Sequence, residues 1–279
     1  MTRSRCITDP VGSANRAFVF RHGCSRIVAD APVIKRQLVK ENGILPEKIE
    51  VIGSAVNLSR FHPNHDKQKF RSEMGIPAEA PLIVNIGMIR PDKGQLTLVE
   101  AARTVLRRHP EARFVFVGEG TGARKLGLRL REAIERYGMA ERVLMLGYRW
   151  DIPDILVACD LVVIASIGTE ASPIVLREAL ACGRPVVATR VGDIAEVIRD
   201  REHGLLVSPG SAEEIAAAIL ELIGNRELAG RCAQNGLQLA RSHFSFDQMM
   251  QHKLRVDTEI AKKNGRDQAA TATPVSAIK

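Results

Sequence analysis

The sequence has 279 residues, 45% of them hydrophobic and 26% charged, which suits one large globular domain or two modest ones with an apolar core. Aromatic residues make up only 4%, which counts against single-stranded nucleic-acid binding. The net charge of +8 favours anionic partners such as nucleotides, although solubility alone would also explain it. Five scattered cysteines, histidines without metal-ligand spacing and the lack of a long apolar run predict a cytoplasmic protein with reduced thiols, no metal site and no transmembrane helix.

The first 80 residues carry little secondary-structure signal. Two short strand patterns, at 26–29 and 48–52, enclose a helical pattern at 33–42. That is too little for an independent sheet. We interpret 1–80 as the remnant of a preceding α/β domain together with the junction to the next domain, so the rest of that domain is expected to be missing or to lie on another chain.

Between residues 81 and 245 short apolar segments alternate with amphipathic stretches of helical length. The strand segments are 82–86, 114–117, 143–146, 161–165, 185–188 and 205–207. The helical segments are 94–108, 121–137, 150–158, 173–182, 193–199, 211–223 and 226–242. Nearly continuous Val, Ile and Leu indicate strands that are buried on both faces. The alternation predicts an α/β fold with a doubly wound parallel, Rossmann-like sheet.

The end of the chain is predicted to be one helix followed by a tail. Ser245 is a suitable N-cap for a C-terminal helix over 246–263. Residues 264–279 are rich in Ala, Thr and Ser and lack a core pattern, so we expect a disordered tail.

Ligands of open α/β sheets bind at the carboxyl ends of the strands, so the turns that follow the strands are the candidate site. The first turn, Gly87–Gly94, brings Arg90 and Lys93 to the start of a helix, which suits a diphosphate, although a surface turn with solvated charges has the same pattern. The second turn contains Gly118 and is rich in glycine, which permits close approach of a ligand but equally fits a plain tight turn.

The third and fourth turns add polar groups. Gly147-Tyr148-Arg149 offers a backbone edge that could contact a base, or is an ordinary loop. The fourth turn carries two glutamates eight positions apart, Glu170 in the loop and Glu178 inside an otherwise apolar helix that begins near Pro173. A carboxylate among apolar neighbours costs stability unless it accepts hydrogen bonds, which sugar hydroxyls can supply; a salt bridge or a solvated position is the alternative.

The segment from Glu170 to Gly183 resembles the E-x7-E motif of retaining GT-B glycosyltransferases of group 1, also called family 4. The turn ending in Lys93-Gly94 resembles that family's phosphate turn, and Val117-Gly118-Glu119-Gly120 and Leu146-Gly147 resemble its next two strand ends. The similarity covers roughly residues 25–260. Met88 departs from the family pattern, which often has Arg at that position, and Arg90 is the nearest substitute.

The resemblance implies a role for each matching residue in the phosphate and sugar part of the site. Lys93, with Arg90, would bind the donor diphosphate. Glu170 would hold the hydroxyls of the donor sugar at the reacting centre. Ser172 and Ile174 would offer backbone N–H groups to the phosphate and sugar.

For the nucleoside, the resemblance implies that Glu178 grips the ribose and that Tyr148 and Arg149 flank the base, beside the Gly118 turn. The donor would be a nucleotide-sugar such as a UDP- or GDP-sugar, no metal would be needed, and transfer would retain the anomeric configuration. The acceptor would be a glycan, a lipid or a polysaccharide, and peripheral contact with the inner face of a membrane is compatible with the family.

Two alternatives remain at this point. A truncated module that binds a nucleotide-sugar without turnover would share every motif above. A dinucleotide-dependent oxidoreductase needs an intact G-x-G-x-x-G turn and a later acidic residue, whereas this chain has Gly118-Glu119-Gly120-Thr121-Gly122.

Overall fold

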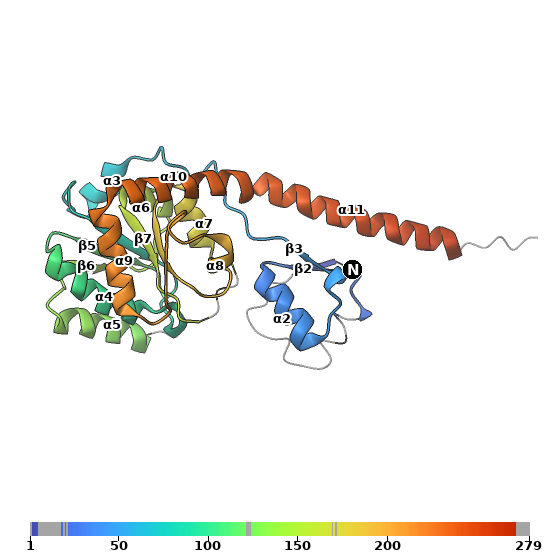
Figure 1. Cartoon of the computed structure of the whole chain (residues 1–279), viewed down its shortest axis with the longest axis horizontal. Helices are drawn as coiled ribbons and strands as arrows, with labels where there is room; N and C mark the ends of the chain where they lie inside the picture. Colours follow the sequence, from blue (N-terminus) through green and yellow to red (C-terminus); the bar gives the residue numbers. More distant parts are fainter. Residues whose placement is uncertain are drawn as a thin grey trace, which may run out of the picture. The chain divides into compact units, whose positions relative to one another are not determined.

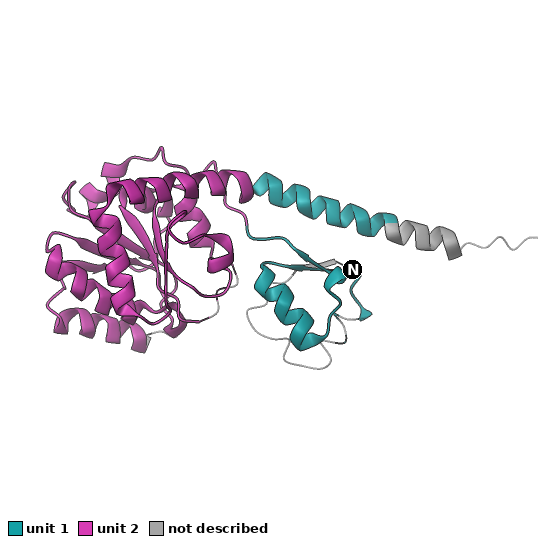
Figure 2. Cartoon of the chain, viewed as in Figure 1, with its two compact units in different colours: residues 1–54, 246–279 teal, residues 55–245 magenta. Residues whose placement is uncertain are grey.

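The computed structural model describes residues 2–4, 18, 20, 22–120, 124–168, 170 and 172–271. The chain divides into two compact units (Figure 2). One unit comprises residues 1–54 and 246–279, and the other comprises residues 55–245.

The first unit contains a parallel three-stranded sheet in the order β1-β2-β3. Its elements are β1 Thr2–Ser4, β2 Arg26–Ala29, α2 Pro32–Asn42, the 3-10 helix η1 Pro46–Lys48, β3 Ile49–Val51 and α11 Phe246–Thr271. The sequence predicts two of the three strands, and the pairing of Thr2–Ser4 with β2 completes a sheet that we did not expect. A small apolar cluster joins β2 to α11 through Val28, Ile52 and Val256.

α11 also differs from its predicted length. The helix continues to Thr271, past the expected end at 263. Gln268, Ala269 and Ala270 are residue types with high helix propensity, which is consistent with this extension.

The second unit is the predicted doubly wound α/β domain (Figure 1). Six parallel strands run in the order β6-β5-β4-β7-β8-β9. The strands are β4 Leu82–Ile86, β5 Arg113–Val117, β6 Val143–Met145, β7 Leu161–Ile164, β8 Val186–Thr189 and β9 Leu205–Val207. The helices are α3 Lys67–Glu73, the 3-10 helix η2 Pro91–Lys93, α4 Gln95–Arg108, α5 Arg124–Arg136, α6 Ile152–Ala158, α7 Ile174–Ala181, α8 Ile194–Val197, α9 Ala212–Gly224 and α10 Arg226–His243.

The continuous apolar strands are buried on both faces, as the sequence predicts. Successive residues of a strand point to opposite faces. In β4, Leu82 and Val84 pack with α6 and α7, whereas Ile83 packs on the opposite face with α4, α5 and α9. The sheet therefore lies between two separate apolar cores. A binding site can then form at the edge where the carboxyl ends of the strands lie.

Residues 55–80 pack against the sheet rather than with the first unit. Phe61, Phe70 and Ile76 belong to the apolar core on the α6–α7 face. The apolar pattern predicts that this domain starts at 81, and α3 was not predicted. Asp66 caps that helix by accepting a hydrogen bond from the backbone N–H of Gln68 at 2.8 Å. The compact unit therefore starts near Ala55.

Candidate functional site

The strand order reverses between β4 and β7, and the ends of these two strands border a cavity of about 280 Å³. Ligands of open α/β sheets bind at such switch points. The polar side chains among its lining residues are Asn85, Lys93, Gln95, Ser166, Glu170 and Ser172. A larger cavity of about 400 Å³ lies between α4 and α9 and contains no residue that the sequence assigns to the site.

Lys93 and Glu170 meet in this cavity. The Nζ atom of Lys93 forms an ion pair with Oε1 of Glu170, and the hydroxyl of Ser166 donates a hydrogen bond to the same oxygen. The Glu170 side chain is only 10% exposed, so these contacts offset the cost of burying its charge. The two side chains that the sequence assigns to diphosphate and sugar are therefore direct neighbours.

The backbone of Glu170 is held by the loop after β8. The carbonyl of Glu170 accepts a hydrogen bond from the N–H of Asp193 at 2.7 Å. Gly192 has a φ of +53°, and a Cβ atom there would lie 1.9 Å from that carbonyl oxygen. A side chain at 192 is thus excluded both by its φ angle and by this close approach, and the loop fixes where the carboxylate points.

The turn that carries Lys93 is packed against the loop after β7. Gly94 has a φ of +64°, and a Cβ atom there would lie 1.9 Å from the carbonyl oxygen of Ala165. The carbonyl of Asp92 accepts a hydrogen bond from the N–H of Ile167 at 2.8 Å. Arg90 is about half exposed and donates to the Asp92 carboxylate at 2.9 Å; it does not line the cavity.

The start of α7 supplies the opposite wall. Ser172, Pro173 and Ile174 line the cavity, and the first turn of any α-helix leaves backbone N–H groups without partners inside the helix. These N–H groups and the positive end of the helix dipole favour an anion. Thr169 and Ala171, which flank Glu170 in the sequence, lie outside the described residues.

Glu178 does not line the cavity. It follows Ile174 by four residues, so it lies on the same face of α7 and one turn further along. Burial raises the pKa of Glu178 to about 7, and the charge of Arg60 opposes this increase. The carboxylate has no hydrogen bond or ion pair with any described residue. The structure thus brings Lys93 and Glu170 together, whereas Glu178 lies one turn further along α7 and outside the lining of the cavity.

The turns after β4, β5 and β6 are packed together through glycines. The N–H of Gly118 donates to the carbonyl of Gly147 at 2.7 Å, and the N–H of Gly87 donates to the carbonyl of Val117 at 2.9 Å. A Cβ atom on Gly118 would lie 2.0 Å from the carbonyl oxygen of Gly87. Tyr148 follows this group and is 75% exposed, so its ring is accessible. Thr121 and Gly122, at the end of the glycine-rich turn, are outside the described residues.

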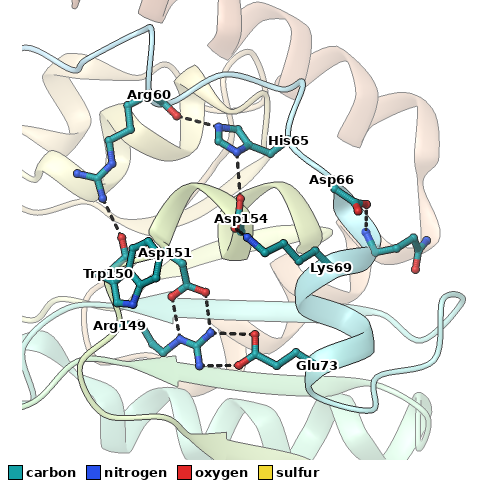
Figure 3. Close-up of polar contacts among 10 residues, drawn as sticks. Arg60, His65, Asp66, Lys69, Glu73, Arg149, Trp150, Asp151 and Asp154 are labelled. Atoms are coloured by element: carbon teal, nitrogen blue, oxygen red, sulfur yellow. Dashed lines mark hydrogen bonds and ion pairs between the residues drawn. The ribbon is translucent and has the colours of Figure 1, made fainter.

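Arg149 has a different environment from Tyr148 (Figure 3). Its guanidinium donates to Asp151 from Nε at 2.8 Å and from Nη2 at 2.6 Å. It also donates to Glu73 from Nη1 at 2.8 Å and from Nη2 at 3.1 Å. The hydrogen bonds from Arg149 lower the pKa of the Asp151 carboxyl. The side chain that the sequence places beside a base therefore ties the β6–α6 loop to α3.

The segment before α3 is attached to α6 by further polar contacts (Figure 3). The Nε2 atom of His65 donates to the carbonyl of Arg60 at 2.8 Å, and Nδ1 lies 3.0 Å from the Asp154 carboxylate. Arg60 in turn donates to the carbonyl of Trp150 at 2.8 Å. These contacts hold the positive charge of Arg60 on the side of the domain that carries Glu178.

Sequence reasoning missed three polar residues of the cavity, Asn85, Gln95 and Ser166. Asn85 interrupts the apolar strand β4 and donates to the carbonyl of Val163 at 2.8 Å. Gln95 is 2% exposed and donates to the carbonyl of Met88 at 2.9 Å. A polar residue inside an apolar strand, and a glutamine directly after the Lys93-Gly94 turn, were the available signals.

Among the residues that the structure describes, no cluster of three or more His, Cys, Asp or Glu side chains is arranged to bind a metal ion. Within the same residues, no helix combines the length and apolar character needed to cross a membrane.

Sequence comparison identifies related proteins. The family model described as "Glycosyl transferases group 1" matches residues 66–239. The D-inositol 3-phosphate glycosyltransferase of Segniliparus rotundus is 32% identical over 228 residues, which are 80% of this chain and 49% of that protein. The chain thus spans about half the length of the curated relative that it matches.

Structure comparison finds the same fold in solved proteins. The Anabaena protein HepE, crystallised in complex with UDP, has a TM-score of 0.86 and 25% identity, with 92% of this chain and 72% of that chain covered. The C-terminal domain of the group 1 family protein LpcC from Francisella tularensis has a TM-score of 0.63 and 31% identity, with 68% of this chain and 99% of that domain covered. The Rossmann-like GT-B domain predicted from the sequence is confirmed.

Proposed function

Because this chain belongs to the group 1 glycosyl transferases, we propose that it takes part in transferring a sugar from a nucleotide-sugar donor to a glycan, lipid or polysaccharide acceptor. The observation that carries the proposal is the contact between Lys93 and Glu170 in the cavity at the β4–β7 switch point. It supplies a cation for a diphosphate and a hydrogen-bond acceptor for a sugar within one small volume. The UDP bound to HepE, a protein of the same fold, supports a nucleotide ligand.

The diphosphate is assigned to the Lys93 side of the cavity. Lys93 contributes a charge, and the N–H groups of Ser172 and Ile174 at the start of α7 contribute hydrogen-bond donors. Arg90 reaches the outer phosphate oxygens once it leaves Asp92. These groups offset the charge that develops on the leaving diphosphate, so the proposed reaction needs no metal ion.

Glu170 is the proposed catalytic residue. When the diphosphate draws Lys93 toward itself, the Glu170 carboxylate becomes available to accept hydrogen bonds from the donor sugar. Holding the sugar beside the leaving group positions the anomeric carbon for attack, which is the contribution of orientation to catalysis. Departure and attack on the same side of the sugar would retain the anomeric configuration.

The nucleoside is assigned to the neighbouring surface. Glu178 has a half-buried carboxylate without a partner among the described residues, and the two ribose hydroxyls are suitable donors to it. The backbone of the Gly147–Arg149 turn and the exposed ring of Tyr148 are placed beside the base, with the Gly118 turn against the donor. Arg149 contributes by holding the β6–α6 loop in position.

We place the reaction in the cytoplasm, where the acceptor is a glycan or a lipid-linked sugar and the protein contacts the inner face of a membrane peripherally. The acceptor itself is assigned to residues outside the second unit. Because the chain covers about half of its curated relatives, donor binding is the part of the reaction that residues 55–245 support directly.

The test uses the purified chain with UDP-glucose, UDP-galactose, UDP-N-acetylglucosamine and GDP-mannose. Calorimetry measures binding, and release of free sugar measures donor cleavage. We expect at least one nucleotide-sugar to bind and to release sugar, and Glu170→Gln to abolish release. Binding without release would favour the module that has no turnover. Absence of binding to every member of the panel would contradict the proposal.

A further inference from the structure

Gln95 occupies a special position at the start of α4. It follows Gly94, whose close approach to Ala165 brings the helix start against the end of β7. Gln95 is one of the residues that line the switch-point cavity, and it is only 2% exposed. A glutamine at an ordinary helix start extends into water, and this one is almost completely removed from it.

The orientation of the Gln95 amide follows from its contact with Met88. The Met88 carbonyl can only accept a hydrogen bond, so the atom 2.9 Å from it is the amide nitrogen. The amide oxygen, Oε1, is then the atom left over. It is buried and has no hydrogen-bond partner among the described residues.

A second buried oxygen in the same cavity also lacks a described partner. Ser172 Oγ lies at the start of α7, and its hydroxyl makes no hydrogen bond among the described residues. Buried polar atoms in native proteins are nearly always hydrogen-bonded, so two such oxygens in one cavity indicate a ligand that completes them. Ser166, by contrast, already donates to Glu170.

The chemistry of an amide oxygen restricts what can occupy this part of the cavity. Oε1 accepts hydrogen bonds and cannot donate them. Phosphate oxygens are acceptors as well, so they are repelled from Oε1 and attracted to Lys93. A hydroxyl group, which donates, fits Oε1. The lining of the cavity therefore favours a ligand that has both an anionic group for Lys93 and a hydroxyl for Gln95.

We propose that Gln95 is a specificity-determining residue, whose buried amide oxygen accepts a hydrogen bond from one hydroxyl of the donor sugar while its amide nitrogen holds the Met88 turn. This inference rests on the proposed function, because it assumes that the donor sugar enters this cavity. A site that hydrogen-bonds a particular hydroxyl discriminates strongly against a sugar that lacks it.

The test compares the wild-type chain with Gln95→Met, which keeps the length of the side chain and removes both polar atoms. Calorimetry measures the affinity for UDP and for the nucleotide-sugar that binds the wild type. We expect Gln95→Met to weaken the nucleotide-sugar about ten-fold and UDP less than about two-fold. Gln234→Met, an exposed glutamine of α10, is the matched control and should change neither.

Deoxy analogues of the donor sugar give a second measurement, and its first part needs only the wild-type chain. One of them should bind the wild type about ten-fold more weakly than the parent and should bind Gln95→Met as the parent does. Equal losses for UDP and nucleotide-sugar, or wild-type affinities that are the same for every deoxy analogue, would overturn the assignment of Gln95 alone. Failure of the wild type to bind any nucleotide-sugar would overturn the proposed function with it.

Discussion

Lys93 and Glu170 are 77 positions apart in the sequence, and their side chains form an ion pair in the cavity between β4 and β7. The cation assigned to the donor diphosphate is therefore neutralised by the carboxylate assigned to the donor sugar. Under the proposed assignment, a diphosphate competes with Glu170 for Lys93 and releases the carboxylate for the sugar. This proposal therefore couples the two halves of the donor through one contact.

Replacing Lys93 with alanine should weaken nucleoside diphosphate more than nucleoside monophosphate. The Nζ atom lies on the diphosphate side of the proposed site, so UMP loses little when it is removed. We expect about a ten-fold or larger loss for UDP and about two-fold or less for UMP, since a hydrogen bond to a charged group contributes about 1.5–3 kcal/mol. Titration calorimetry gives both values, and equal losses would contradict a contact with the distal phosphate.

Replacing Glu170 with glutamine should separate binding from turnover. The change removes a negative charge beside Lys93, so the affinity for UDP should stay the same or increase. Release or transfer of the donor sugar should fall by about 100-fold or more, because a preorganised group at the reacting centre is lost. A variant that loses UDP affinity in parallel with turnover would show that Glu170 mainly maintains the structure of the cavity.

Replacing Glu178 with glutamine should weaken nucleotide-sugar binding without unfolding the chain. In the proposed site the ribose hydroxyls donate to the carboxylate, so nucleotide binding should favour its ionised form. Because the pKa of Glu178 is raised to about 7, wild-type affinity should fall as the pH decreases from 8 to 6, and the variant should lack this pH dependence. Calorimetry at both pH values measures this, and unchanged donor affinity in Glu178→Gln would remove the ribose assignment.

The same group affects stability in the opposite direction. The raised pKa means that the folded chain holds the Glu178 proton more tightly than the unfolded chain, whose carboxyl titrates at its ordinary value of 4.5. The contribution of Glu178 to stability is therefore complete below pH 4.5 and is lost as the pH rises through about 7. Glu178→Gln should unfold with about 1–2 kcal/mol more free energy than the wild type at pH 8 and with little difference at pH 5. Urea denaturation at the two pH values tests this, and an equal difference at both would exclude titration of Glu178 as the cause.

Replacing Arg149 with methionine should destabilise the domain rather than abolish nucleotide affinity outright. The change leaves the carboxylates of Asp151 and Glu73 without their bidentate partner, and we expect a loss of about 1–3 kcal/mol in the free energy of unfolding. Arg129→Met, at an exposed position of α5, is the control and should change stability by less than about 0.5 kcal/mol. A destabilisation no greater than that of the control would show that the Arg149 contacts contribute little.

The pattern of apolar residues was sufficient to predict the α/β fold class, because a parallel strand that is covered by helices on both faces must be apolar along its whole length. Leu82–Ile86 and Leu205–Val207 show this most directly, and both were predicted with their observed bounds. The spacing of Glu170 and Glu178, and the turn ending in Lys93-Gly94, were also visible in the sequence. Both patterns are local, so they could be recognised without knowing which strands are neighbours.

Contacts between distant segments could not be inferred in the same way. Nothing near Arg149 in the sequence indicates Glu73, which lies 76 positions earlier on a short helix that was not predicted. In the sequence Gln95 is an ordinary first residue of a helix, and only the packing of Gly94 against Ala165 places it in the lining of the cavity. Local patterning therefore specified the strands, the helices and the chemical groups in the turns. Three-dimensional packing selected which of those groups meet, because the order of strands in the sheet brings together side chains that are far apart along the chain.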